Sequence, residues 1–408
     1  MDEVIKITDD VSWIGIRDYD IVTFDVVMTT EFGTTYNSYF INADKKTIVE
    51  TSKLKFWDKY KEKILSVVDP KEIEYIILDH TEPDHSGNLA NLLAIAPNAK
   101  VVASAVALRN LKDQFDIKFE SVTVKDGDTL DLGNKTIKFF DAVNLHWPDT
   151  IYSYLVEDKI LFSCDSFGAH YCSEKIFNDE IDGDLSEDND YSKAFKYYFD
   201  VILKPFSKFY IKAIDKIRNL DIKYIATGHG PIIRKNIKET MLLSEMLAAK
   251  YISTPDKKYI FIPYVSAYGN TAEIAEYIAE GIKSKDDFEV ETLDIEQVPI
   301  GEIDSKITRA TAVLVGSPTI NQNILLPIYK LFAVINPIRD RGKLCSGFGS
   351  FGWSGESRNI IAANLKNLKL DYFGEGVFFK FSLINNRKDE CIEFGKSFAE
   401  TLIKKSEV

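Results

Sequence analysis

The chain has 408 residues, of which 45% are hydrophobic and 28% charged, as in ordinary soluble globular proteins with roughly two or three domains. Its 50 lysine and arginine residues against 63 aspartate and glutamate residues give a net charge of −13, which argues against a nucleic-acid partner. No apolar stretch approaches the roughly 18–20 residues that span a bilayer, and the acidic N-terminus lacks the layout of a signal peptide, so we expect a cytoplasmic protein.

The four cysteines contain no C-x-x-C pair. This absence excludes a zinc ribbon, a rubredoxin-type iron site and a disulfide framework. We expect four reduced thiols.

Short strands and helices alternate through the N-terminal part of the chain. The hydrophobic periodicity predicts strands at residues 11–16, 36–41, 73–78, 101–104, 136–140, 151–156 and 160–163, and helices at residues 54–68, 88–96, 105–113 and 191–201. Several predicted strands follow one another without a helix between them, so the sheets must be mixed. This pattern favours an αββα sandwich with functional loops at one edge.

All five histidines lie in or near stretches that also carry carboxylates or glycines. The densest is His80-Thr81-Glu82-Pro83-Asp84-His85, which we interpret as a loop whose alternate side chains lie together, stiffened by its proline. Further candidates follow at predicted strand ends. The set exceeds what one ion needs, and a carboxylate could bridge two ions. We therefore predict a two-metal site with the ligand candidates His80, Glu82, Asp84, His85, His146, Asp165 and His229.

The ligand types favour iron. These stretches contain no sulfur ligand, which argues against a structural zinc site, and mixed imidazole and carboxylate ligands suit zinc, iron or manganese. Three carboxylates favour a harder, redox-active ion such as iron. His170, five residues beyond Asp165, is interpreted as a pocket-wall residue that does not bind the ion. We expect Glu82, Asp165 and His170 to take part in the chemistry.

A polar stretch with one proline at residues 253–258 predicts the boundary between a domain of residues 1–252 and one of residues 257–408. Beyond it, predicted strands at residues 259–265, 290–294, 311–316, 343–349 and 377–381 accompany helices at residues 272–283 and 390–403. Such alternation is typical of a doubly wound parallel sheet.

Three turns after strands of this second domain resemble a phosphate and flavin site. Small hydroxyl residues and glycines let backbone N–H groups converge on an anion at a helix N-terminus. The turn from Ser266 to Thr271 has neither a G-x-x-x-x-G-K-[ST] nor a G-x-G-x-x-G pattern, so a monophosphate such as that of FMN fits this turn better than a triphosphate or dinucleotide. Trp353 could stack on the flavin ring. The predicted FMN-binding residues are Ser266, Ala267, Tyr268, Gly269, Asn270, Thr271, Ser317, Pro318, Thr319, Asn321, Ser350, Phe351, Gly352, Trp353, Ser354 and Gly355.

With these stretches identified, the chain resembles the flavodiiron proteins, also called A-type flavoproteins or rubredoxin:oxygen oxidoreductases. The resemblance extends from Trp13-Ile14-Gly15 and Gly33-Thr34-Thr35-Tyr36-Asn37 to Gly352-Trp353-Ser354-Gly355. In the wider metallo-β-lactamase fold the histidine stretch reads H-x-H-x-D-H and binds zinc, and Glu82 in place of the second histidine marks the diiron branch. The implied fold is a metallo-β-lactamase-like αββα sandwich followed by a flavodoxin-like domain.

The resemblance also implies a ligand arrangement and partners. It implies one iron bound by His80, Glu82 and His146, the other by Asp84 and His229, and Asp165 as the bridge between them. It leaves the role of His85 open. It further implies FMN and a head-to-tail homodimer, or a dimer of dimers, that brings the flavin of one subunit to the diiron site of the other.

Two features depart from the family pattern. Asp25 and Val26 follow Phe24, where members often have histidine and glycine, which affects the expected polarity of the substrate pocket. The chain ends at Val408 without a rubredoxin or flavin-reductase extension, so the expected electron donor is a separate protein such as rubredoxin or an NAD(P)H-linked reductase.

The expected activity is four-electron reduction of O2 to water, with reduction of two NO to N2O as the alternative. Two other classes stay open. One is a zinc hydrolase of the metallo-β-lactamase type with an appended flavodoxin for partner docking, and the other is an electron carrier that uses only the flavodoxin half. The carrier leaves the predicted ligand set unexplained.

Overall fold

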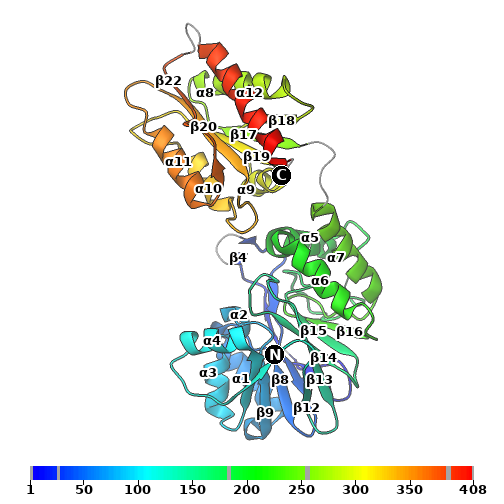
Figure 1. The fold of residues 1–408 in the computed structure, drawn as a ribbon. Helices are drawn as coiled ribbons and strands as arrows, with labels where there is room; N and C mark the ends of the chain where they lie inside the picture. Colours follow the sequence, from blue (N-terminus) through cyan, green and yellow to red (C-terminus); the bar gives the residue numbers. More distant parts are fainter. Residues whose placement is uncertain (1–2, 25–27, 182–184, 253–257, 383–386, 407–408) are drawn as a thin grey trace. The chain divides into compact units, whose positions relative to one another are not determined.

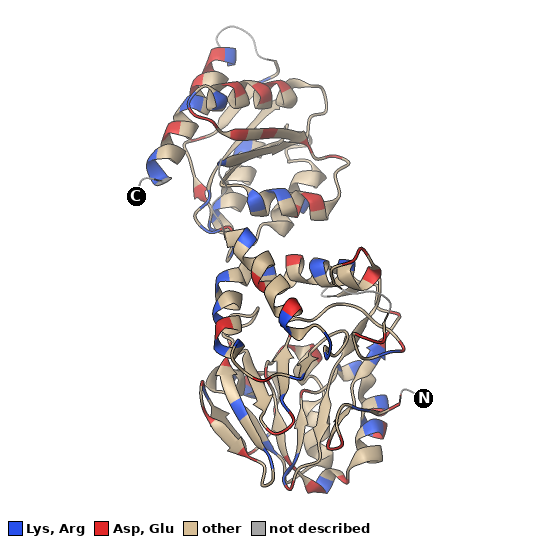
Figure 2. Cartoon of the chain, turned by 90° about the vertical axis from the view of Figure 1, so that its right-hand side faces the viewer, with Lys and Arg blue, Asp and Glu red and all other residues tan. Residues whose placement is uncertain are grey.

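The computed structural model describes residues 3–24, 28–181, 185–252, 258–382 and 387–406. The chain divides into two compact units, residues 1–252 and 253–408 (Figure 1). Charged side chains lie mainly on helices and loops, whereas most of the strand ribbon is uncharged (Figure 2). None of the helices in the described ranges is long and apolar enough to cross a membrane.

The N-terminal unit contains two stacked sheets. The seven-stranded sheet has the order β1 (Ile5–Lys6), β2 (Val11–Trp13), β7 (Tyr39–Ile41), β8 (Lys46–Val49), β9 (Ile73–Ile77), β10 (Lys100–Ser104) and β11 (Ser121–Val124). The five-stranded sheet has the order β12 (Thr129–Asp131), β13 (Thr136–Asp141), β14 (Ile151–Leu155), β15 (Ile160–Cys164) and β16 (Tyr224–Thr227). Two small ribbons pair β3 (Ile16–Asp18) with β6 (Thr34–Tyr36), and β4 (Thr23–Phe24) with β5 (Met28–Thr29).

Helices cover the outer faces of both sheets, as Figure 1 shows. They are α1 (Trp57–Val67), α2 (Pro83–Ser86), α3 (Leu89–Ile95), α4 (Ala105–Gln114), α5 (Asp190–Tyr198), α6 (Ser207–Ile217) and α7 (Ile237–Ile252). Between the sheets, side chains such as Trp13, Ile77, Phe139 and Phe162 form one buried cluster. Outside them, helix residues such as Tyr60 and Tyr210 pack in another. The predicted αββα sandwich is confirmed, and α6 and α7 are helices that the periodicity did not reveal.

Two predicted strands are interrupted in the structure. Residues 11–16 divide into β2 and β3, and residues 36–41 divide into β6 and β7. Asn37 leaves the ladder because its side chain accepts a hydrogen bond from Trp13 Nε1 (2.8 Å) and donates to the carbonyl oxygens of Thr227 and Gly230 (2.9 Å each). This interruption holds the turn that carries His229. The predicted helix at residues 191–201 also changes, since α5 ends at Tyr198 and continues as a π-helical turn, Phe199–Leu203.

The C-terminal unit is a parallel sheet between two helix layers. Its order is β18 (Glu289–Asp294), β17 (Tyr259–Tyr264), β19 (Ala312–Gly316), β20 (Leu344–Phe351) and β21 (Asp371–Tyr372), and β22 (Val377–Lys380) also pairs with β20. One face packs against α9 (Ile300–Arg309), α10 (Leu326–Val334) and α11 (Ser357–Asn367), the other against α8 (Asn270–Lys283) and α12 (Arg387–Ser406).

This arrangement confirms the predicted doubly wound sheet of the flavodoxin kind. Helix α9, which sequence reasoning missed, makes the crossover between the parallel strands β18 and β19. Strand β20 extends to Phe351, so the first two residues of the third predicted flavin turn still belong to the strand.

Candidate metal centre and flavin-binding edge

The histidine-rich stretch is a loop only as far as Glu82. Pro83 is the first residue of the one-turn helix α2, and the N–H groups of His85 and Ser86 both donate to the carbonyl oxygen of Glu82 (2.9 Å each). The predicted alternation of side chains is therefore wrong from Pro83 onward. Proline at the first helical position has a backbone angle suited to a helix and lacks an N–H that would go unpaired there. The helical turn brings Asp84 and His85 to the same buried site.

Four residues form the first group of candidate ligands. Glu82 Oε2 lies 2.9 Å from His146 Nε2 and 3.1 Å from His80 Nε2. Asp165 Oδ2 lies 3.1 Å from the same atom of His146 and 3.5 Å from that of His80. These residues come from the loop after β9, the loop after β13 and the end of β15.

A second group lies on the other side of Asp165. His229 Nε2 is 3.1 Å from Asp84 Oδ2, and His85 Nε2 is 3.5 Å from that same oxygen. Asp165 Oδ1 lies 3.2 Å from His85 Nε2 and 3.5 Å from His229 Nε2. The two carboxylate oxygens of Asp165 thus face different groups of imidazoles. All seven predicted ligand residues are brought together. Their candidate ligand atoms fall into sets, and the atoms within each set lie within 4.8 Å of one another.

The second nitrogen of three of these histidines is held by a further partner. His80 Nδ1 faces Asp149 Oδ1 (3.4 Å), His85 Nδ1 faces Glu50 Oε2 (3.1 Å), and His229 Nδ1 donates to the carbonyl oxygen of Thr35 (2.6 Å). Such contacts orient each ring and leave Nε2 for a metal ion. Sequence reasoning missed Glu50, which lies far from the histidines in the sequence, and Asp149, which follows His146 by three residues but contacts His80.

The electrostatics of the site favour cations. Burial opposes protonation of His80, but hydrogen bonds with Asp149 and Glu82 raise its pKa to about 9. Burial likewise opposes charging of His146, while hydrogen bonds with Asp165 and Glu82 raise its pKa to about 10. Burial would raise the pKa of Asp165, but the surrounding imidazoles lower it well below its ordinary value.

Several buried atoms of the cluster also have no hydrogen-bond partner among the described residues. They include both carboxylate oxygens of Asp84, Asp165 Oδ2 and His85 Nε2. Buried polar atoms are normally paired, and buried carboxylates normally bind a cation. The donor set therefore fits two divalent ions that share Asp165.

A cysteine also reaches the site. Cys164 directly precedes Asp165, and its Sγ lies within 4.8 Å of the ligand atoms of His80, His85 and Asp165. Sequence reasoning excluded sulfur from the ligand stretches and did not consider this neighbour. Burial raises the pKa of the Cys164 thiol well above its ordinary value, which favours its protonated form.

Aromatic side chains form one wall of the metal cluster. His170 stacks on Phe24 with ring centroids 4.5 Å apart, and it meets Tyr198 edge-on at 4.8 Å. Tyr198 Oη donates to Asp165 Oδ1 (3.0 Å). Burial and the nearby His229 lower the pKa of His170 to about 3, so this ring is neutral. It belongs to none of the candidate ligand sets among the described residues. The departure at residues 25 and 26 lies outside the described residues.

The predicted flavin turns meet at one edge of the parallel sheet. Gly269 has φ +82° and precedes α8, and Ser266 Oγ accepts a hydrogen bond from Ala272 N (3.2 Å). Thr271 Oγ1 lies 3.3 Å from Ser350 Oγ, and Thr319 N donates to the carbonyl oxygen of Ser350 (2.8 Å). The turns after β17, β19 and β20 are therefore contiguous.

Two large aromatic residues project from this edge. Tyr268 is 89% exposed and Trp353 is 85% exposed. An indole exposed between two glycines is available to stack on a planar ligand. Together with the hydroxyl groups and the N-terminus of the 14-residue helix α8, they fit the phosphate and ring of FMN.

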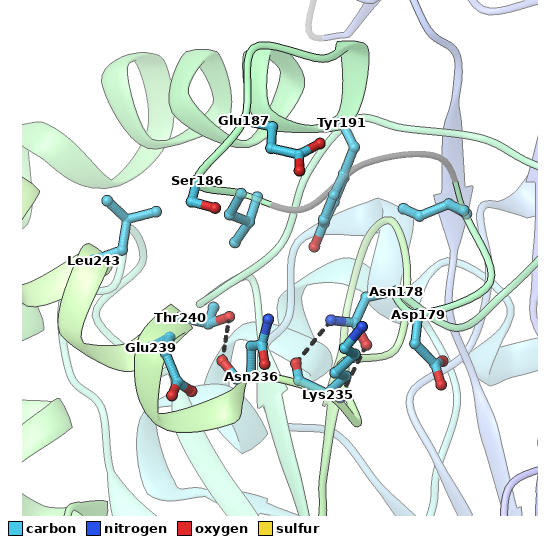
Figure 3. A pocket seen from close by; sticks show the side chains of 12 residues that line it. Asn178, Asp179, Ser186, Glu187, Tyr191, Lys235, Asn236, Glu239, Thr240 and Leu243 are labelled. Atoms are coloured by element: carbon cyan, nitrogen blue, oxygen red, sulfur yellow. Dashed lines mark hydrogen bonds between the residues drawn. The ribbon is translucent and has the colours of Figure 1, made fainter.

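A separate cavity of about 480 Å³ lies between the loop around Asn178 and the first turn of α7 (Figure 3). Tyr191 points into it, while Lys235 and Glu239 stand on its rim. No candidate metal ligand is among the described residues that line it. The cavity belongs to neither the metal centre nor the flavin edge.

Known proteins resemble both units. The family model described as ODP family beta lactamase matches residues 34–230, and the flavodoxin model matches residues 262–395. A flavo-diiron protein, FprA2 of Clostridium acetobutylicum, is 40% identical, with 98% of this chain and 99% of that protein covered. The chain belongs to the flavodiiron protein family.

Two further relatives of this flavodiiron protein have names that refer to different substrates. The nitric oxide reductase of Moorella thermoacetica is 31% identical over 98% of this chain and 99% of its own. The solved rubredoxin oxygen:oxidoreductase of Desulfovibrio gigas is 28% identical, covers 100% of both chains and has a TM-score of 0.75. Membership implies an oxidoreductase with FMN and a non-haem diiron site, which confirms the predicted cofactors and disfavours the zinc hydrolase and the simple carrier.

Proposed function

We propose that this flavodiiron protein reduces O2 to water, with electrons relayed through FMN from a separate donor protein. The observation that carries the proposal is Asp165, a fully buried carboxylate whose two oxygens face two groups of imidazoles at 3.1–3.5 Å. Reduction of NO to N2O is the second candidate, since one relative carries the name nitric oxide reductase.

The residues would hold the irons in two sets that share Asp165. His80, Glu82 and His146 would bind one ion, and Asp84 and His229 the other. His85 joins the second set, because its Nε2 is buried, has no hydrogen-bond partner among the described residues and lies near Asp84 and Asp165. Glu50 holds the opposite nitrogen of that ring.

Electron number supports O2 as the substrate. When bound, two ferrous ions and a reduced FMN together supply four electrons, the number that converts O2 into two water molecules, whereas coupling two NO molecules needs only two. The protein supplies the placement of the cofactors and excludes side reactions. For this purpose Phe24 and Tyr36 keep the side of His229 dry, since both are buried and contact its ring edge-on.

Two polar groups beside the cluster would serve the substrate. Tyr198 Oη holds Asp165 by a hydrogen bond, and His170 is neutral with a buried Nε2 that has no partner among the described residues. A neutral imidazole that donates a hydrogen bond stabilises negative charge developing on oxygen without first having to lose or gain a proton.

The donor and the assembly are part of the proposal. We expect a rubredoxin-type protein or an NAD(P)H-linked reductase to reduce the FMN, and a head-to-tail dimer or a dimer of dimers to pair the cofactors. The exposed Tyr268 and Trp353 beside the flavin edge support a further contact there. Sedimentation of the holoprotein tests the assembly, and a monomer at working concentration would contradict it.

Stopped-flow mixing of the fully reduced holoprotein with each gas tests the choice of substrate. We expect O2 to reoxidise the flavin faster than NO does, with little release of H2O2. Faster reoxidation by NO would establish the second candidate instead. Near-stoichiometric zinc, no iron and no flavin absorption would overturn both candidates.

A further inference from the structure

Among the described residues, His170 has one close polar partner, which is a threonine hydroxyl. Thr34 Oγ1 lies 2.9 Å from His170 Nδ1, and both residues are buried. The ring is fixed on its other sides by Phe24 and Tyr198, whose centroids lie 4.5 and 4.8 Å away. Because the ring is held in this way, the direction of the hydrogen bond to Thr34 decides which nitrogen carries the proton.

The distances favour Thr34 as the donor. Its hydroxyl has a single hydrogen, and the alternative acceptor is the carbonyl oxygen of Thr35 at 3.4 Å, compared with 2.9 Å to His170 Nδ1. An O–H···O bond at that longer distance is weak, since such bonds are usually about 2.7–2.8 Å long. If Thr34 donates, the neutral ring of His170 has its only N–H at Nε2.

The second nitrogen of the His170 ring agrees with this assignment. Nε2 is buried and has no partner among the described residues, so an N–H there is free to bind a ligand in the pocket. The opposite tautomer would place a lone pair in that position.

We propose that Thr34 is a positioning residue whose hydroxyl donates to His170 Nδ1, so that His170 presents an Nε2–H to an oxygen atom of the substrate. The contact with substrate rests on the proposed function, whereas the tautomer does not. Thr34 acts only through His170 and touches neither metal nor substrate.

The test compares three variants with the wild type. Thr34→Val removes the hydroxyl at nearly constant shape, and Thr34→Ser keeps it. Thr47→Val is the matched control, because this threonine is also buried in a strand but its hydroxyl binds the carbonyl oxygen of Lys45. The chain has only five histidines, so labelled histidine nitrogens are resolvable by NMR in the FMN-containing holoprotein with diamagnetic zinc in place of iron.

We expect the Nε2–H tautomer of His170 in the wild type, Thr34→Ser and Thr47→Val, and its loss in Thr34→Val. In the iron-containing holoprotein, Thr34→Val should lower kcat for O2 by about tenfold to a hundredfold, raise the H2O2 released per O2 consumed and leave KM nearly unchanged, as expected for loss of one hydrogen-bond donor. Thr34→Ser should restore all three.

An Nδ1–H tautomer in the wild type, or no change of tautomer in Thr34→Val, would overturn the inference. Failure of the proposed function gives a different result. If the wild type does not reduce O2, the tautomer comparison still stands, and the same kinetic comparison is made with NO as substrate.

Discussion

Replacing Asp165 by asparagine should empty the metal centre while leaving the flavin in place. The carboxylate is 1% exposed, and its oxygens lie 3.1–3.5 Å from Nε2 of four histidines. Asp165→Asn keeps the shape of the side chain but removes a negative charge at the centre of the cluster. Both candidate ion positions adjoin this one residue, so both ions should bind more weakly.

The size of the effect follows from Coulomb's law. At about 4 Å and an effective dielectric constant of about 20, one unit charge acting on another is worth about 4 kcal/mol. This corresponds to about a thousandfold in binding constant for each ion. A residue that only holds a ligand should have a smaller effect, so Asp149→Asn, which weakens the contact to His80 Nδ1, should cost about tenfold to a hundredfold.

The assay is elemental analysis of iron per chain after dialysis against graded chelator, with flavin absorbance measured in the same samples. Asp158→Asn is the matched control, since this aspartate in the turn between β14 and β15 also has a largely buried side chain (9% exposed) but pairs with Lys135 (2.6 Å). The control should keep its iron. Retention of both irons by Asp165→Asn at wild-type chelator concentrations would refute a shared carboxylate.

Three further predictions concern pH and the second unit. In metal-free protein the pKa values of His146 and His80 are raised to about 10 and about 9, above the unfolded value near 6.5. The contribution of these two imidazoles to folding stability is therefore complete below about pH 6.5 and is lost as the pH rises through about 9–10. The melting temperature of chelator-treated protein should therefore fall between about pH 7 and 10, and that of iron-loaded protein should not; parallel profiles would contradict this. Gly349→Ala would place a Cβ 2.0 Å from a backbone carbonyl oxygen of the turn after β19 and should reduce FMN per chain. Gly342→Ala, outside the predicted flavin turns, meets no atom within 4 Å and should cost only about 1–2 kcal/mol for its positive φ; equal flavin loss in both would argue against a rigid edge. Asp340→Asn should destabilise the flavodoxin-like unit by about 3–5 kcal/mol in denaturant titrations, because it breaks the ion pair between the fully buried Asp340 and Arg339. Unchanged stability would show that this pair is dispensable.

Local patterns in the chain were sufficient for both architectures and for candidate ligands that the fold brings together. Short apolar runs predicted most strands, because those strands bury one or both faces in a core. The stretch from His80 to His85 and the turn from Ser266 to Thr271 are contiguous, so their chemistry is visible without a fold. Candidate ligands at separate strand ends, such as His146 and His229, were recognised because histidine is rare in this chain.

The helical turn at Pro83 and the divided strand at Asn37 were not predicted. In both places specific hydrogen bonds prevail over the structure that the local sequence pattern predicts. The carbonyl oxygen of Glu82 accepts two backbone hydrogen bonds that close the turn. The side chain of Asn37 forms hydrogen bonds with Trp13 and with Gly230, next to His229. Hydrophobic periodicity indicates which residues are buried, but it does not indicate such individual hydrogen bonds.

Only the tertiary structure selected the residues that orient the histidine rings of the site. Three such contacts join residues that are far apart in the sequence. The separation is 35 residues for Glu50 and His85, 69 for Asp149 and His80, and 136 for Thr34 and His170. The chain has 63 aspartate and glutamate residues, and the residues next to them in the sequence do not show which of them become buried beside an imidazole. Folding decides this, because a carboxylate loses its water and gains an imidazole partner only when distant strand ends pack against one another.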